Sequence, residues 1–226
     1  MLLYRIIVLV IGYFCGIFLS GYAYSRSRHK DITTMGSGNA GTTNAFRMFG
    51  WKAGLITLLG DVSKPIFAIF LTWLLFRSRE PEGVRLLQLY AGLGTIIGHN
   101  HPFYMKHFKG GKGIACTGGM MIAFCPIEVP VGLSLFLLMT ALTGYVSVGS
   151  MVGLVSFFVQ TVLFGELGLL NVTETYRMEI YALSAVIMLM GIVRHRENIS
   201  RLLHGNENKF SLKKKEGTSE SWRKQE

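Results

Sequence analysis

Residues 113–165 read GIACTGGMMIAFCPIEVPVGLSLFLLMTALTGYVSVGSMVGLVSFFVQTVLFG and contain one charged side chain, that of Glu128. This run is too long for one buried helix, and a membrane span needs about 20 apolar residues. Residues 6–24 and 53–76 also contain few charged side chains. Half of the 226 residues are hydrophobic and 16% are charged, which is unusual for a soluble domain of this size. The sequence therefore predicts an all-α, polytopic helical membrane protein.

About seven transmembrane helices are expected, because Pro126, Pro130 and Gly149 divide the long apolar run. We predict helices at 3–24, 51–76, 84–99, 113–127, 129–144, 147–166 and 177–194. A helix of about 15 residues rises only about 22 Å, less than the hydrocarbon core of about 30 Å. The short segments must therefore pack against neighbouring helices, extend into the membrane interface or be half-helices. Six spans is the alternative to seven.

The distribution of positive charge predicts the orientation. Seven spans place three polar segments on one side: the glycine loop (36–47), the lysine loop (108–113) and the histidine segment (195–199). Seventeen Lys and Arg residues lie near these segments or in the tail, and five lie on the other side. Because positive charge favours the cytoplasm, we expect a cytoplasmic active site and an external N-terminus. Residues 1–205 form the predicted membrane domain, and 206–226 a disordered, basic cytoplasmic tail rather than a lipid-binding one.

The polar segments contain the residue types that bind phosphate. Glycines allow backbone N–H groups to converge on an anion, and nearby Arg, Lys and His supply positive charge. Residues 36–41 also satisfy the dinucleotide pattern G-x-G-x-x-G, but they follow a membrane helix rather than a strand. Gly111-Lys112 is not a P-loop, because Gly113 stands where Ser or Thr is required. We therefore expect a phosphorylated ligand at the membrane edge without a nucleotide-binding fold.

Other ionisable residues have simpler interpretations. Asp61 and Lys64 lie three apart inside a span, where a structural ion pair that braces the site is favoured over direct chemistry. His99 and His101 lack a matching Cys or acidic cluster, so local hydrogen bonding is expected. The three cysteines lie in apolar runs and indicate neither a disulfide nor a metal site. We expect no metal and no cofactor.

In this order and between these spans, the segments resemble the bacterial acyl-phosphate:glycerol-3-phosphate acyltransferase family. The similarity extends over about residues 12–207. It rests on Ser37-Gly38-Asn39 with Asn44 and Arg47, Gly98-His99 with Pro102, Phe108-Lys109-Gly110-Gly111-Lys112-Gly113, and His195-Arg196-Glu197-Asn198-Ile199 with Arg201-Leu202.

The resemblance implies transfer of a fatty acyl group from acyl phosphate to the 1-hydroxyl of glycerol 3-phosphate. The expected products are 1-acylglycerol 3-phosphate and phosphate. The implied catalytic residues are Ser37, Arg47, Lys112, His195 and Asn198, of which the first three bind the phosphate of glycerol 3-phosphate and the last two orient its hydroxyl. The implied substrate-binding residues are Gly38, Asn39, Gly41, Thr43, Asn44, Lys109, Gly110, Gly111, Gly113, Ser147, Ser150 and Glu197.

The group that accepts the proton of the attacking hydroxyl is left open. The candidates are His195, Glu197 and an oxygen of the substrate phosphate. Acyl phosphate carries a good leaving group, so direct attack in a ternary complex is expected rather than an acyl-enzyme. The other glycerol-phosphate acyltransferase class is disfavoured because no His is followed five residues later by Asp. The alternative function is an organophosphate or anion transporter, although no internal repeat is evident. We expect the protein to lie in the bacterial inner membrane, in contact with the bilayer, and to have no nucleic-acid partner. The oligomeric state is left open, and a monomer is one of the possibilities.

Overall fold

The computed structural model describes residues 1–105 and 110–209 and contains no strand within these ranges. The predicted all-α class is therefore confirmed. The helices are α1 (Leu2–Gly16), α2 (Ser20–Ser27), η1 (Ile32–Thr34), α3 (Thr42–Phe49), α4 (Trp51–Phe76), α5 (Val84–Asn100), α6 (Ile114–Phe124), η3 (Pro126–Glu128), α7 (Val129–Thr143), α8 (Val146–Glu166), α9 (Glu174–Arg194) and α10 (Arg196–Leu203).

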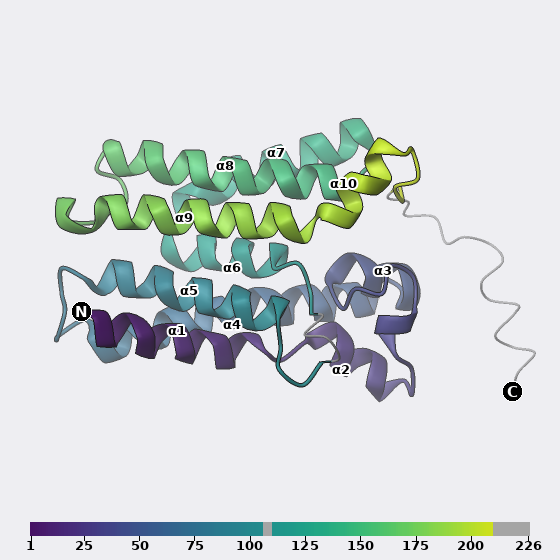
Figure 1. Ribbon diagram of the computed structural model, residues 1–226, viewed down its shortest axis with the longest axis horizontal. Helices are drawn as coiled ribbons and strands as arrows, with labels where there is room; N and C mark the ends of the chain where they lie inside the picture. The colour runs from purple at the N-terminus through teal and green to yellow at the C-terminus, as the bar shows by residue number, and fades with distance from the viewer. Residues whose placement is uncertain (106–109, 210–226) are drawn as a thin grey trace, which may run out of the picture.

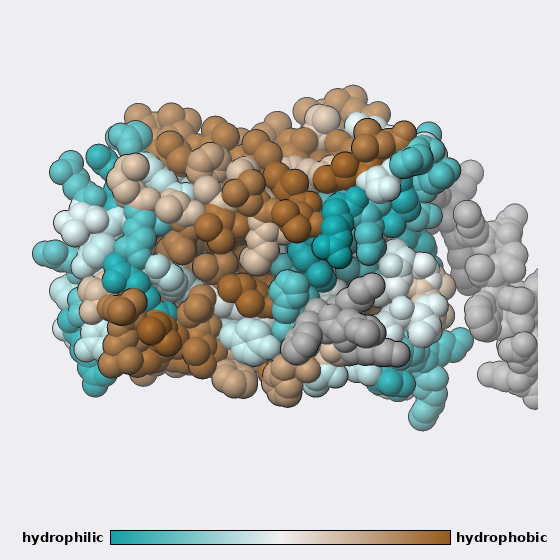
Figure 2. Space-filling model, viewed as in Figure 1, coloured by the Kyte–Doolittle hydropathy of each residue, from teal (hydrophilic) through white to brown (hydrophobic). Residues whose placement is uncertain are grey.

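The long helices lie side by side along the long axis of the molecule (Figure 1). On the face shown in Figure 2, brown apolar residues cover most of the middle, with hydrophilic residues at both ends. Five segments of the described chain are long and apolar enough to cross a membrane: Leu2–Ser27, Trp51–Phe76, Pro126–Thr143, Val146–Glu166 and Glu174–Arg194. The remaining two expected spans correspond to the shorter helices α5 and α6. At 11 residues, α6 rises only about 16 Å and is a half-helix.

The N-terminus lies at one end of the bundle, whereas α3 and α10 lie at the other (Figure 1). The described parts of the three polar segments therefore meet at one end of the molecule, as the sequence predicts. We call this end the polar-segment end. Its orientation toward the cytoplasm stays a prediction based on charge.

Helix α5 forms the centre of the bundle, because most of its residues are buried. It packs closely against α1 through small residues on both helices. A Cβ on Gly12 would lie 2.1 Å from the carbonyl oxygen of Ala91, and one on Gly98 would lie 2.2 Å from that of Tyr13. Glycine at these positions allows the two backbones to approach, as is common for helices packed in membranes.

Several boundaries differ from the sequence prediction: α6 ends at Phe124 rather than at 127, and α9 begins at Glu174 rather than at 177. The expected helix 3–24 is divided into α1 and α2, because Leu19 adopts an extended conformation (φ −91°, ψ 102°). The carbonyl group of Phe18, freed by this break, accepts a hydrogen bond of 2.8 Å from Lys64 Nζ. In addition, two eight-residue helices lie outside the predicted ranges: α3, which begins within the glycine loop, and α10, which begins directly after His195.

Candidate active site

A cavity of about 410 Å³ opens among α3, α4, α6, α7, α8 and α10. One part is polar and is lined by Ser37, Asn39, Gly41, Thr42, Thr43, Asn44, Arg47, Asp61, His99, Lys112, Gly113, Thr117, Ser147, Ser150, His195, Asn198, Arg201, Glu207 and Asn208. The other part is apolar and is lined by Leu58, Val62, Ile114, Ala115, Gly118, Met121, Ile122, Val129, Gly132, Leu133, Phe136, Val146, Gly153 and Leu154. The cavity therefore joins a charged site to a groove suited to a hydrocarbon chain.

The glycine loop is held by the buried amide of Asn44. Its Oδ1 accepts from the Ser37 amide at 3.1 Å, and its Nδ2 donates to the carbonyl groups of Met35 at 3.0 Å and Asn39 at 2.9 Å. Asn39 Oδ1 in turn accepts from the Gly41 amide at 2.9 Å. These bonds fix the start of α3 beside the cavity, where the first N–H groups of the helix have no intrahelical acceptor. Such a helix start favours an anion.

The lysine loop is fixed through its glycine backbone. The amides of Gly110 and Gly111 donate to the carbonyl groups of Asn100 at 3.1 Å and His99 at 3.0 Å, so they are not available to an anion. The carbonyl groups of both glycines accept hydrogen bonds from the Arg194 guanidinium, the shortest 2.8 Å to Gly111. This clamp directs Lys112 into the cavity, where its Nζ donates to Asn198 Oδ1.

The carboxylate of Glu207 accepts hydrogen bonds from side chains of α8 and α10. Its Oε1 accepts from Asn198 Nδ2 at 2.7 Å and from Ser147 Oγ at 3.2 Å. Its Oε2 accepts from Arg201 Nε at 2.7 Å. Glu207 therefore positions Asn198 and Ser147 at the polar part of the cavity and offsets part of its positive charge.

Burial shifts the pKa values of the cavity cations. Desolvation lowers the pKa of Lys112 to about 8, with a further lowering by Arg201. Desolvation also lowers the pKa of Arg47, which Glu207 opposes. An anion bound in the cavity, in addition to the Glu207 carboxylate, would favour the charged forms of Lys112 and Arg47. Opposite charges stabilise one another at short range.

One ring nitrogen of His195, Nε2, has no hydrogen-bond partner in the part of the chain that the structure describes. The other, Nδ1, lies 2.8 Å from the Gly191 carbonyl oxygen, which only accepts, so Nδ1 carries the proton and Nε2 is unprotonated. Burial lowers the pKa of His195 to about 4, so the ring is neutral near pH 7. Nε2 can therefore accept a hydrogen bond from a substrate hydroxyl.

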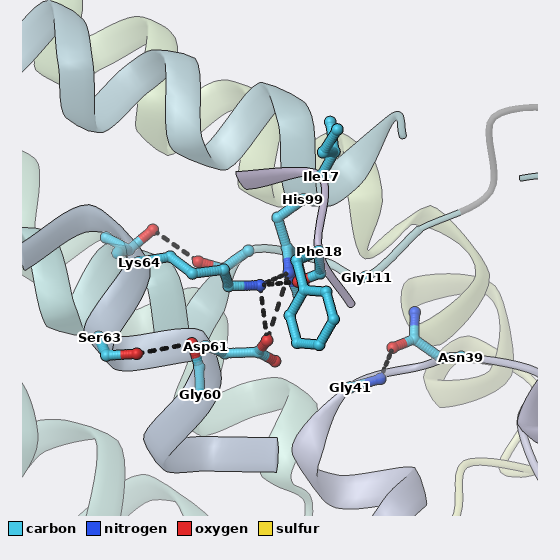
Figure 3. A network of polar contacts seen from close by, with 12 residues as sticks. Ile17, Phe18, Asn39, Gly41, Gly60, Asp61, Ser63, Lys64, His99 and Gly111 are labelled. Atoms are coloured by element: carbon cyan, nitrogen blue, oxygen red, sulfur yellow. Dashed lines mark hydrogen bonds and ion pairs between the residues drawn. The ribbon is translucent and has the colours of Figure 1, made fainter. Parts of the chain in front are cut away.

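A buried polar network lies beside the cavity and connects four segments (Figure 3). Lys64 Nζ lies 2.8 Å from Asp61 Oδ1, 2.8 Å from the Phe18 carbonyl oxygen and 3.1 Å from His99 Nδ1. All three donors of the ammonium group are therefore used. The network ties α4 to the break between α1 and α2 and, through His99, to the lysine loop. The ion pair expected between Asp61 and Lys64 is confirmed.

The structure brings most of the sequence-predicted site residues into this cavity: Ser37, Asn39, Gly41, Thr43, Asn44, Arg47, Lys112, Gly113, Ser147, Ser150, His195 and Asn198. Gly38, Gly110, Gly111 and Glu197 do not line it, and Glu197 is exposed on α10. Lys109 lies outside the described residues. Within the described ranges, no group of three or more His, Cys, Asp or Glu side chains could hold a metal ion.

Comparison with known proteins agrees with this geometry. The family profile described as "Glycerol-3-phosphate acyltransferase" matches residues 6–205. The chain belongs to this family. Proteins named glycerol-3-phosphate acyltransferase from Finegoldia magna and Clostridioides difficile are each 37% identical to it over 212 residues, which cover 92% of this chain and 97% of theirs. The glycerol 3-phosphate form of PlsY (YgiH), an integral membrane glycerol 3-phosphate acyltransferase, superposes with a TM-score of 0.78 at 28% identity, covering 92% of this chain and 96% of that one.

Glu207 is a cavity-lining residue that the sequence analysis did not predict, as are Thr42, Thr117 and Asn208. It was assigned to the polar tail, and it lies two residues beyond the range that the family profile matches. The structure nevertheless brings its carboxylate to Asn198 and Arg201. The available signal was an acid that follows Asn198 and Arg201 within nine residues.

Proposed function

We propose that this acyltransferase uses acyl phosphate as donor and the 1-hydroxyl of glycerol 3-phosphate as acceptor. The observation that supports this most is the continuity of the cavity, from a cation-rich part to an apolar groove between α4, α6, α7 and α8. Two phosphate-bearing anions repel one another, and Arg47 and Lys112 offset this repulsion. A hydrocarbon chain is soluble only in the apolar part, so a reactant with a phosphate and an acyl tail would extend across both.

The proposed reaction is a direct displacement. The hydroxyl oxygen attacks the acyl carbonyl carbon, the bond from that carbon to the phosphate oxygen breaks, and phosphate leaves with the electron pair. His195 Nε2 and Asn198 orient the hydroxyl. Because burial lowers the pKa of His195 to about 4, this ring is a weak base, and we assign the proton to an oxygen of the departing phosphate. Glu197 is not assigned this role because its side chain is exposed away from the cavity.

The setting of the reaction follows from the same geometry. The polar part of the cavity lies at the polar-segment end, which we propose faces the cytoplasm of a bacterium, with the N-terminus outside. The acyl donor would then enter from the bilayer and glycerol 3-phosphate from the cytosol.

Donor choice tests the proposal directly. Purified protein should form lysophosphatidic acid from acyl phosphate and glycerol 3-phosphate, and should not form it from acyl-CoA or acyl carrier protein thioesters. Product is measured by mass spectrometry with donors of the same chain length. Equal rates with a thioester donor would contradict the proposal, because the proposed displacement requires a phosphate as the leaving group of the donor.

Steady-state kinetics should distinguish direct transfer from an acyl-enzyme. Initial-rate plots against both substrates are expected to intersect, because a ternary complex precedes the reaction. Replacement of Cys15, Cys116 and Cys125 with alanine should retain activity, since none is required as a nucleophile. Parallel plots, or an acylated Ser147 or Ser150 peptide after incubation with acyl phosphate alone, would overturn direct attack.

The rate should also depend on the charge of Lys112. Because its pKa is lowered to about 8, Lys112 is charged below this pH and loses its charge above it. We expect kcat/KM for glycerol 3-phosphate to fall above about pH 8, approaching tenfold per unit, as the free enzyme loses its cation. A profile from pH 6 to 10 measures this. A flat alkaline limb would show that the charge of Lys112 is not required.

A further inference from the structure

A second hollow, separate from the catalytic cavity, lies where α2, α3 and α4 meet. We call it the basic–aromatic pocket, and it is lined by Tyr24, Arg28, Lys30, Phe49, Gly50, Trp51 and Lys52. These residues share no member with the lining of the catalytic cavity. The pocket lies at the polar-segment end, because α3 ends and α4 begins there.

The pocket combines aromatic walls with positive charge. The Arg28 guanidinium carbon lies 5.5 Å from the centre of the Tyr24 ring, and Lys52 Nζ lies 5.8 Å from that of Trp51. Neither cation has a carboxylate partner within residues 1–105 and 110–209. The nearby acid, Asp31, pairs instead with Arg26 at 3.6 Å. Arg28 and Lys52 therefore bring positive charge to the pocket without an ion-pair partner among the acids of the described chain.

An apolar surface continues from the pocket along α4. Trp51 is 63% exposed, and the exposed Leu55 and Leu59 follow at intervals of four residues. Residues four apart lie on one face of a helix. Because α4 is long and apolar enough to cross the membrane, this face would contact lipid tails directly below the cations, with Trp51 at the interface, where tryptophan is common.

We propose that the basic–aromatic pocket binds the phosphate headgroup of an anionic phospholipid, with its acyl chains along the Trp51–Leu59 face of α4. The cations would bind the phosphate of the headgroup. The apolar face would bind the acyl chains, which favours a lipid over free phosphate. Anionic headgroups are attracted by clustered Lys and Arg beside a span. This inference does not depend on the donor or mechanism of the acyl transfer.

The bound lipid would also brace the catalytic site through α3. This eight-residue helix lines the catalytic cavity through Thr43 and Arg47, and its last residue, Phe49, lines the basic–aromatic pocket. Gly50, the residue that joins α3 to α4, has a φ of +86° and nothing within 4 Å of an added Cβ. An occupant of the pocket would contact Phe49 and Gly50 at this junction and so restrict movement of α3 about the glycine.

Trp51 itself provides the test. The variant Trp73→Phe/Trp222→Phe leaves Trp51 as the only tryptophan. It is reconstituted into bilayers with a small fraction of brominated phosphatidylglycerol or, separately, brominated phosphatidylcholine, in an unlabelled phosphatidylcholine background. We expect stronger quenching of Trp51 by the anionic lipid, corresponding to a relative affinity on the order of tenfold. Adding Arg28→Gln and Lys52→Gln should make the two lipids equivalent.

Two controls separate a defined site from general attraction. Arg196→Gln/Lys209→Gln removes the same charge from the same end, outside the pocket, and should keep the preference. Arg28→Lys/Lys52→Arg conserves charge and should also keep it. Equal quenching by the two lipids in the parent reporter would overturn the proposal, as would an equal loss in the Arg196/Lys209 control. Reversal by millimolar inorganic phosphate would assign the pocket to free phosphate instead of a lipid.

Discussion

Replacing Arg47 or Lys112 with alanine is expected to lower kcat/KM by on the order of 10²-fold or more, as for other lost electrostatic contacts to a transition state. Both side chains line the polar part of the catalytic cavity. Each would leave phosphate charge without a partner while the reactants are brought together. The measurement is lysophosphatidic acid formation with saturating acyl phosphate and varied glycerol 3-phosphate.

Two further variants make this prediction specific. Lys112→Arg should also be impaired, because a planar guanidinium does not replace a compact ammonium beside Gly113 and Asn198. Arg26→Ala is the matched control, since it removes a cation at the polar-segment end that does not line the catalytic cavity. Near-normal kcat/KM in Lys112→Ala would indicate that the lysine loop is structural.

The long helices were predictable because their signals are local. Helix α4 has the predicted bounds, since its apolar run begins after Gly50 and ends before Arg77. The break between α1 and α2 has no such signal, because Ile17, Phe18 and Leu19 are all apolar. It depends on Lys64, 46 residues from Phe18, which donates to the freed carbonyl group. A contact of this separation cannot be read from the pattern around the break.

The catalytic site was predictable to the extent that its residues cluster in sequence. The polar segments identified Arg47, Lys112, His195 and Asn198, which the fold brings to one cavity. What each glycine does was not predictable. Gly110 and Gly111 were expected to offer amides to an anion, but the end of α5 accepts both N–H groups. Local composition indicates a phosphate site, whereas the donors that remain free depend on the packing of distant helices.

Replacing Lys64 with methionine is expected to destabilise the protein by about 3–5 kcal/mol, as when one partner of a buried ion pair is removed. The change leaves the Asp61 carboxylate, which is 1% exposed, without its ammonium partner. It also removes the donor to the Phe18 carbonyl group. Thermal unfolding in detergent measures the effect through a thiol-reactive fluorophore, because Cys116 and Cys125 are buried and become reactive as the helices separate.

The exposed pair Arg26–Asp31 provides the control, since its cation is 57% exposed. Arg26→Met should cost no more than about 1 kcal/mol, because water screens the pair and solvates the remaining charge. Asp61→Asn/Lys64→Met should be more stable than Lys64→Met alone, since it no longer buries an unpaired carboxylate. If Lys64→Met unfolds at the same temperature as Arg26→Met, the network does not stabilise the fold. A loss of activity without a loss of stability would instead indicate that Lys64 acts on the lysine loop through His99.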